Sequence, residues 1–252
     1  MHVMAPTPEN HPDRARSSTP ASLPVSAPPS ASASPSVPVP ASVPAHPAPY
    51  GHGLRLRMWD AESDAEVAHW IRGRSDPEFL RWNTPGQTDT DLRGARLAML
   101  GQLQSAKDGR SAPFCITDAV TGRVLGAVSV NMIDRFQRTA RVGYWVLPEA
   151  RGQRVATRAL ALAARWAFTE LELHRLELGH ALGHDASCRI AQNCGFAYEG
   201  TLRDAMFAAG RHDAFRDMHL HARLATDAES AADPPETGKK PGDRPAAAPC
   251  HH

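Results

Sequence analysis

The stretch GYWVLPEARGQRVAT, residues 143–157, contains the end of one element, a turn and the start of the next. A strand rich in β-branched and aromatic residues is predicted over 140–147, and Pro148 ends it because proline donates no hydrogen bond to a sheet. A long helix is predicted from about Gln153 to Glu172. Its positions from 155 to 171 are nearly all apolar, which indicates burial on most of its surface.

The turn of this strand–turn–helix unit is suited to bind an anion. The first turn of a helix has free N–H groups and the positive end of the helix dipole. Gly152 allows a ligand to approach the backbone closely. Arg151, Arg154 and Arg158 recur at helical spacing, so they share one face near that terminus. The pattern predicts a pyrophosphate site; the alternative is an ordinary connection with surface arginines.

Strands and helices alternate on both sides of this unit. Strands are predicted from period-two alternation or β-branched runs, and helices from capping residues followed by apolar spacing. The other predicted strands are 54–58, 114–117, 124–133, 175–180, one opening at Phe196, and 214–224. The other predicted helices follow caps at 60–64, begin at Asp76-Pro77, run from Asp89 or Thr90 to about Lys107, and run from about Asp185 to Asn193. This order predicts an α/β (α+β) fold, a mixed sheet with helices on its faces.

Proline divides the chain into three parts. Residues 1–50 hold 13 of the 22 prolines and residues 226–252 hold five, whereas residues 51–225 hold four, together with all five Trp and all seven Phe. Segments made of Pro, Ala and Ser bury too little apolar surface to fold. We therefore predict disordered tails at 1–50 and 226–252 around one domain, residues 51–225.

Composition argues against several classes of protein. The net charge of +1 is too small to indicate nucleic-acid binding, and no apolar run approaches the roughly 18 residues of a membrane helix. Four cysteines are too few for a disulfide framework, so reduced thiols and a cytoplasmic location are expected. The ending Cys250-His251-His252 resembles a metal tag but lacks further ligands, so no metal is expected.

Two motifs resemble those of the GNAT N-acetyltransferases. The pattern Arg/Gln-x-x-Gly-x-Gly/Ala of motif A corresponds to 151–156, with Arg154 in place of its Gly. Such an arginine is tolerable if the backbone keeps ordinary helical angles. Motif B, a Ser-containing helix that ends in Gly-Phe, corresponds to DASCRIAQNCGF, 185–196. The opening strand, the stretch 76–82 and the final hairpin resemble the ribosomal-protein N-terminal acetyltransferase (RimJ/RimL-like) branch, with His184 where the branch has Asn.

The resemblance implies a mostly antiparallel sheet and direct transfer of an acetyl group from acetyl-CoA to a primary amine. Strand 144–147 would pair with the pantetheine arm, and an N–H near Val146 or Leu147 would polarise the thioester carbonyl. Trp82 and Asn83 are expected to line the amine pocket. The residues implied to hold acetyl-CoA are Val146, Leu147, Arg151, Gly152, Gln153, Arg154, Val155, Ala156, Thr157 and His184.

The resemblance also implies catalytic candidates. Ser187 would lie near the departing sulfur and donate a proton; its alternative role is a helix N-cap or first-turn serine. Tyr144 lies on the strand near the expected reaction centre, with a core aromatic as the alternative. Glu149, His180 and His184 are weaker candidates for the base, and a base that acts through water is a further alternative.

The acceptor amine is left open by the sequence. The branch implies the N-terminal α-amine of a protein, of the ribosomal-protein type. Polyamines and aminoglycosides are alternatives, because a fold does not determine its substrate. A non-catalytic acyl-CoA-binding regulatory module is the second functional class, and release of free thiol from acetyl-CoA distinguishes the two. Membrane binding is not expected, and a homodimer is left open.

Overall fold

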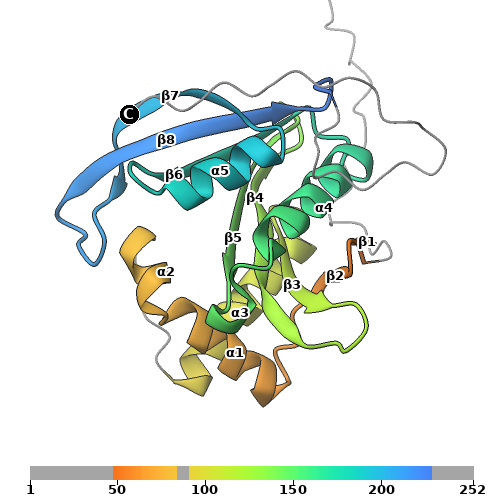
Figure 1. Cartoon of the computed structure of the whole chain (residues 1–252). Helices are drawn as coiled ribbons and strands as arrows, with labels where there is room; N and C mark the ends of the chain where they lie inside the picture. The colour runs from red at the N-terminus through yellow and green to blue at the C-terminus, as the bar shows by residue number, and fades with distance from the viewer. Residues whose placement is uncertain (1–47, 84–90, 229–252) are drawn as a thin grey trace, which may run out of the picture. The chain divides into compact units, whose positions relative to one another are not determined.

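The computed structural model describes residues 48–83 and 91–228. Its eight strands form one sheet in the order β1-β2-β3-β4-β5-β6-β8-β7 (Figure 1). Neighbours are antiparallel except β5 and β6, which are parallel. The strands are β1 (Tyr50–Gly51), β2 (Leu54–Met58), β3 (Ala112–Asp118), β4 (Val124–Asp134), β5 (Thr139–Val146), β6 (Arg175–Ala181), β7 (Ala197–Phe207) and β8 (Phe215–Leu224).

Side-chain caps fix where the first helices begin. Ser63 accepts a hydrogen bond from the backbone N–H of Glu66. Asp76, which precedes Pro77, accepts one from the backbone N–H of Phe79. Asp91 caps the third helix, so the prediction of Asp89 or Thr90 is wrong by one or two residues. The helices are α1 (Asp64–Arg74), α2 (Pro77–Trp82), α3 (Leu92–Lys107), α4 (Val155–Thr169), α5 (Asp185–Asn193) and the 3-10 turn η1 (Pro148–Ala150).

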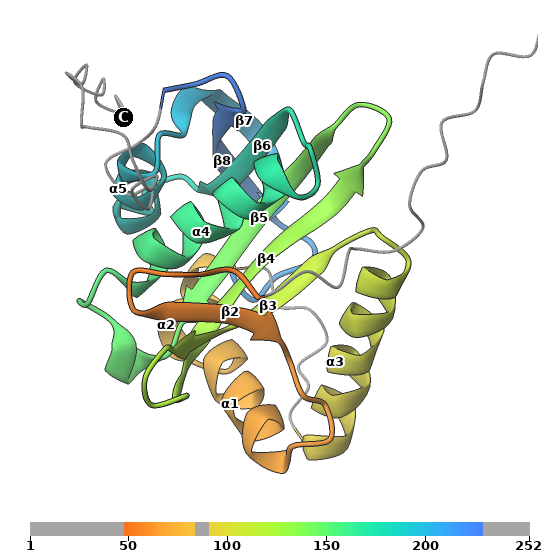
Figure 2. The same ribbon diagram turned by 90° about the vertical axis from the view of Figure 1, so that its right-hand side faces the viewer.

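Helices cover both faces of the sheet, and successive side chains of β3 pack under different helices. Phe114 and Ile116 belong to the core cluster under α4, whereas Cys115 between them belongs to the cluster under α1 and α3. Successive side chains of a strand point to opposite faces, so both faces of β3 are buried. Figure 2 shows α4 in front of β4 and β5.

The predicted fold class, a mixed and mostly antiparallel sheet flanked by helices, is confirmed. The predicted start of α4 at Gln153 is wrong, because Gly152 and Arg154 have positive φ angles of 73° and 56°. The strand β1 and the 3-10 turn η1 were not predicted, since two or three residues are too short for a periodic pattern. Cys115 and Cys194 are free thiols, but Cys188 is disulfide-bonded, so the prediction of reduced cysteines is wrong there.

The predicted tails lie almost entirely outside the described residues. The boundaries at 51 and 225 stay a prediction. β1 begins at Tyr50, and the carbonyl of Pro49 accepts a hydrogen bond from the N–H of Leu56. None of the helices in the described ranges is long and apolar enough to cross a membrane.

A glycine in α1 makes room for a tryptophan of β5. A Cβ atom on Gly73 would lie 2.1 Å from the ring of Trp145. The centroid of that ring lies 6.0 Å from the ring centroid of Trp59. We expect Gly73→Ala to destabilise the fold by about 1–3 kcal/mol, because a rigid ring must move. Gly101→Ala in α3 is the matched control: its Cβ would meet nothing, and a gain of up to about 1 kcal/mol is expected. Chemical denaturation of both variants measures this, and equal effects would contradict it.

Candidate active site

The sheet opens where β5 and β6 part. These strands are paired only at Thr139–Arg141 with Arg175–Glu177, and β6 then continues alongside β8. The second half of β5 therefore has β4 on one side and no paired strand on the other. Figure 1 shows α4 and α5 beside this opening, with α2 near its other end.

A cavity of about 460 Å³ fills this region. It is lined from α2 by Glu78, Phe79, Trp82 and Asn83; from β5 by Tyr144, Trp145 and Val146; from the turn and α4 by Ala150–Gly152 and Arg154–Thr157; and from α5 by His184, Ala186, Arg189, Ile190 and Asn193. The cavity thus brings together residues from both predicted motifs and from the predicted amine pocket.

The N-terminus of α4 forms one end of the cavity. Arg154 is the N-cap residue, with φ 56° and ψ 23°, and its side chain makes no capping hydrogen bond. The condition under which this arginine would be tolerable, ordinary helical angles, is not met, because its backbone lies in the left-handed region. That conformation costs a residue with a Cβ atom about 1–2 kcal/mol. The turn therefore has a cationic side chain at a position whose backbone conformation glycine would adopt without strain.

The three arginines predicted to share a face at the phosphate site differ in their contacts. The side chain of Arg151 forms an ion pair with the buried carboxylate of Asp76. The guanidinium of Arg158 donates to the carbonyls of His52 (2.6 Å) and Gln153 (3.2 Å), which ties the turn to the start of the domain. Arg154 lines the cavity and is exposed. The sequence predicted that the three arginines share one face near the helix terminus; two of them, Arg151 and Arg158, are engaged by protein partners.

Asp76 is held as a carboxylate by its partners. Desolvation opposes its charge, but hydrogen bonds from Arg151 and from the N–H of Phe79 outweigh it and keep its pKa below the usual value. Asp76 caps α2 with the same side chain. The Asp76–Arg151 pair thus links the cavity's turn to the helix that carries Trp82.

Val146 and Leu147 differ in what their N–H groups can do. The N–H of Leu147 donates to the carbonyl of Leu125 at 2.9 Å, and the Leu147 side chain is fully buried. Because pairing alternates along an antiparallel strand, the N–H of Val146 points away from β4, toward the open side of β5. Val146 lines the cavity and Leu147 does not.

Tyr144 and Ser187 meet at the floor of the cavity. The Tyr144 hydroxyl and Ser187 Oγ are 2.8 Å apart, and burial raises the pKa of Tyr144 well above its ordinary value. Tyr144 is therefore a neutral phenol near pH 7 and no base. Ser187 is buried behind it and does not line the cavity. The helix α5 is capped at His184, so the alternative N-cap role for Ser187 is wrong; it lies in the first turn.

The exposed face of α5 is set by helical spacing. Ala186, Arg189, Ile190 and Asn193 recur at intervals of three and four residues and line the cavity. The buried residues of this helix, Ser187, Cys188 and Ala191, lie on its other face. Arg189 thus supplies a second cation beside Arg154.

An aromatic wall closes the end of the cavity near α2. The rings of Trp82 and His184 stack, with centroids 4.4 Å apart and planes within 3°. Trp82 Nε1 donates to the Glu78 carboxylate at 2.7 Å, and Asn83 Nδ2 donates to the carbonyl of Phe79. Burial lowers the pKa of His184, which favours a neutral imidazole. Glu78 is the one carboxylate among the lining residues that the structure describes.

Two candidates for the base lie outside the cavity. Glu149 forms an ion pair with Arg72 and does not line it. His180 is buried, and desolvation lowers its pKa to about 4. Its Nδ1 is 3.0 Å from the carbonyl of Ala181. Neither side chain is placed to reach an amine in the cavity.

Most of the predicted residues meet at this cavity. Of the predicted acetyl-CoA residues, the structure leaves Leu147 and Gln153 outside the lining, and Gln153 Nε2 donates to the carbonyl of Glu149. Glu78 and Arg189 were missed. Glu78 precedes Trp82 by four residues on one helix, and Arg189 shares a face with Asn193, so helical spacing could have found both.

The chain belongs to the GNAT family of acetyltransferases: the model of the acetyltransferase (GNAT) domain matches residues 53–197. The predicted recognition and enzyme class are thereby confirmed. Among solved structures, Mycobacterium smegmatis RimJ in complex with CoA-disulfide is similar with a TM-score of 0.64 and 27% identity, over 71% of this chain and 86% of that one.

The names of the relatives mention two kinds of acceptor, a ribosomal protein and spermidine. The Escherichia coli ribosomal-protein-serine acetyltransferase is 28% identical over 58% of this chain and 78% of that protein. The Escherichia coli spermidine N(1)-acetyltransferase is 32% identical over 65% of this chain and 83% of that protein. YdaF of Bacillus subtilis is 34% identical over 36% of this chain, a match that spans half of that protein.

Proposed function

We propose that this N-acetyltransferase moves the acetyl group of acetyl-CoA directly to the N-terminal α-amine of a protein, of the ribosomal-protein type. The observation that carries the proposal is the cavity between β5 and β6, which has a cationic end and an aromatic, carboxylate-bearing end. The cationic end fits the phosphates of acetyl-CoA, and the aromatic end with its carboxylate fits an amine.

The cationic end would hold the phosphates. An uncapped helix terminus offers free N–H groups to an anion, and Arg154 and Arg189 lie beside it. The open side of β5 would hold the pantetheine arm, with the N–H of Val146 as donor to the thioester carbonyl. Such a donor stabilises the negative charge that builds on oxygen when the amine attacks.

The transfer forms a C–N bond and breaks the C–S bond, so one proton leaves the nitrogen and the sulfur departs with an electron pair. A thiol has a pKa near 8.5 and its thiolate is less basic than the Tyr144 phenolate. We therefore assign to Tyr144 a hydrogen bond to the departing sulfur, with its own proton retained. Ser187 would donate to the Tyr144 oxygen and so aim the phenol's hydrogen at the sulfur.

The charges around the acceptor favour a single amine over a polyamine. Of the cavity residues that the structure describes, Glu78 supplies the one negative charge at the acceptor end, while Arg154 and Arg189 at the other end are assigned to the phosphates. Spermidine carries several cationic amines and would meet too few carboxylates among the described lining residues. A protein N-terminus brings one amine and then extends toward solvent.

The test is an acceptor screen read by release of free thiol from acetyl-CoA. A peptide with a free N-terminal serine should be turned over. The same peptide with a blocked N-terminus and an internal lysine should not, and spermidine and an aminoglycoside should be poor acceptors. Preference for spermidine would select the polyamine alternative. Binding of acetyl-CoA without turnover of any acceptor would select the regulatory module.

The carboxylate of Glu78 is proposed to accept the amine's proton, directly or through water. Glu78→Gln keeps an acceptor for Trp82 Nε1 but removes the charge, so kcat/KM for the peptide should fall about 100-fold at pH 7. The defect should shrink above about pH 8.5, where an α-amine with a pKa near 8 is already neutral. Glu62→Gln, at an exposed glutamate before α1, is the control and should leave the rate unchanged. A pH-independent defect would contradict a proton-accepting role.

A further inference from the structure

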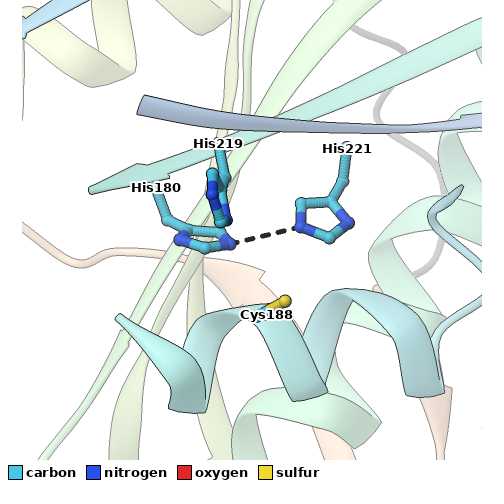
Figure 3. Close-up of side chains that lie close together, drawn as sticks. All are labelled: His180, Cys188, His219 and His221. Carbon is cyan, nitrogen blue, oxygen red and sulfur yellow. Dashed lines mark hydrogen bonds between the residues drawn. The ribbon is translucent and has the colours of Figure 1, made fainter. Parts of the chain in front are cut away.

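Three histidines and a cysteine meet behind the active site, in a place that the proposed transfer does not use. His180 on β6 is paired directly with His219 on β8, and His221 lies two residues further on the same face. Cys188 on α5 faces the three rings from the neighbouring helix (Figure 3). All four side chains are buried, with at most 6% of each residue exposed.

Backbone carbonyls determine which ring nitrogens carry hydrogen in two of these histidines. His180 Nδ1 lies 3.0 Å from the carbonyl of Ala181, and His221 Nδ1 lies 3.3 Å from the carbonyl of Phe196. A carbonyl oxygen can only accept, so each Nδ1 is the donor, and in a neutral ring each Nε2 then presents a lone pair. The two Nε2 atoms face one another at 3.3 Å. Two lone pairs at this distance call for a cation between them.

A metal ion fits this arrangement better than a shared proton. A proton uses two acceptors, whereas the ligand atoms of all four residues lie within 4.8 Å of one another. A tetrahedral Zn²⁺ ion with bonds of about 2.05 Å separates its nitrogen ligands by about 3.3 Å, which is the observed spacing of the two Nε2 atoms. Carbonyls that hold the Nδ1 hydrogens are the usual outer partners of ligating histidines.

We propose that His180, His219 and His221, with the thiolate of Cys188, bind a zinc-type divalent metal ion that fixes α5 against β6 and β8. Imidazole and thiolate ligands select such an ion over Mg²⁺ or Ca²⁺. The sequence predicted no metal, because its cysteines and histidines lack a familiar local spacing. The alternating His219-Leu220-His221 on one strand was the signal that could have indicated the site.

The site needs the reduced protein. Cys188 is disulfide-bonded in this structure, and a metal ligand must be a thiolate. A phosphine reductant supplies the two electrons that convert the disulfide into two thiols, and metal binding then displaces the proton of Cys188. The metal would hold the buried face of α5. Ser187, the residue before Cys188 on this helix, contacts Tyr144.

Titration of the reduced full-length chain with Co²⁺ tests the proposal, because tetrahedral cobalt has visible absorption bands and a cobalt–sulfur bond adds a near-ultraviolet band. The residues Cys250, His251 and His252 offer rival ligands, so the parent protein carries Cys250→Ser, His251→Ala and His252→Ala. We expect one Co²⁺ per chain, displaced by Zn²⁺ and not by Mg²⁺. Zn²⁺ should also raise the melting temperature.

Variants in the parent locate the ion. Cys188→Ser should abolish the cobalt–sulfur band, and His221→Ala and His219→Gln should each weaken binding at least about tenfold. Cys194→Ser, at a buried cysteine outside the cluster and in no disulfide, and His174→Ala, at an exposed histidine, are the matched controls and should bind as the parent does. Failure of the reduced parent to bind Co²⁺, or a sulfur band that survives Cys188→Ser, would overturn the proposal. Both readouts are independent of acetyl transfer.

Discussion

Replacing Tyr144 with phenylalanine is expected to lower kcat about 100-fold, the loss found when one preorganised donor to a developing charge is removed. KM for acetyl-CoA should stay within about threefold, because the hydrogen bond to sulfur strengthens only as the thiolate forms. The phenyl ring keeps its packing, so the change removes one hydroxyl. Steady-state kinetics with a peptide acceptor measure both constants.

Two further variants separate catalysis from structure. Ser187→Ala should cost less, about fivefold in kcat, because Ser187 acts by orienting Tyr144 and a net hydrogen bond is worth about 1 kcal/mol. Tyr198→Phe is the matched control: its hydroxyl lies 2.8 Å from Thr201 Oγ1 on exposed β7, and its loss should leave kcat unchanged. If Tyr144→Phe keeps full activity, the assignment of the donor fails.

Arg154→Glu is expected to weaken acetyl-CoA binding roughly 100-fold. A hydrogen bond to a charged group contributes about 1.5–3 kcal/mol, and the reversed charge adds repulsion. At a ligand concentration of about 100 times the wild-type Kd, wild type should gain ~2.7 kcal/mol of stability and the variant about 0.4 kcal/mol. Thermal or chemical denaturation with and without acetyl-CoA measures the difference.

The left-handed backbone of Arg154 gives this experiment an internal comparison. Arg154→Gly removes the charge and relieves about 1 kcal/mol of conformational cost, so it should stabilise the protein without ligand and still bind acetyl-CoA more weakly. Arg93→Glu, at an exposed arginine on α3, controls for net charge and should change neither quantity. Equal acetyl-CoA binding by wild type and Arg154→Glu would mean that the phosphates lie elsewhere.

The sequence predicts the elements well where the chain is periodic or capped. The pair Asp76-Pro77 places α2, and Gly195 ends α5 at its observed last residue, Asn193. Prediction fails where single dihedral angles decide. No pattern indicates that Arg154 is left-handed, so the predicted helix begins two residues too early and the three arginines are given one shared face.

The site was harder to predict because its contacts join distant segments. Arg151 finds Asp76, which is 75 residues away, and Arg158 reaches His52, which is 106 residues away. Local spacing could not assign these partners, so the three arginines were predicted to share one face beside the anion site. The motif implied a place near the sulfur for Ser187, and its contact with the Tyr144 hydroxyl joins residues 43 positions apart, which local spacing could not indicate.

Arg216 has a consequence for the order in which the protein folds. Its guanidinium, on β8, donates to the carbonyls of Arg81 (3.2 Å) and Trp82 (2.7 Å) at the end of α2, across 135 and 134 residues of sequence. Contacts between such distant segments form slowly, because a long loop must close first. The turn before α4 follows β5 directly in sequence, and its contacts with Asp76 and His52 join it to segments that precede it, so it can form before β8 docks. During refolding, the ability to bind acetyl-CoA should therefore return before the ability to bind the acceptor, which waits for the β7–β8 hairpin to dock on α2.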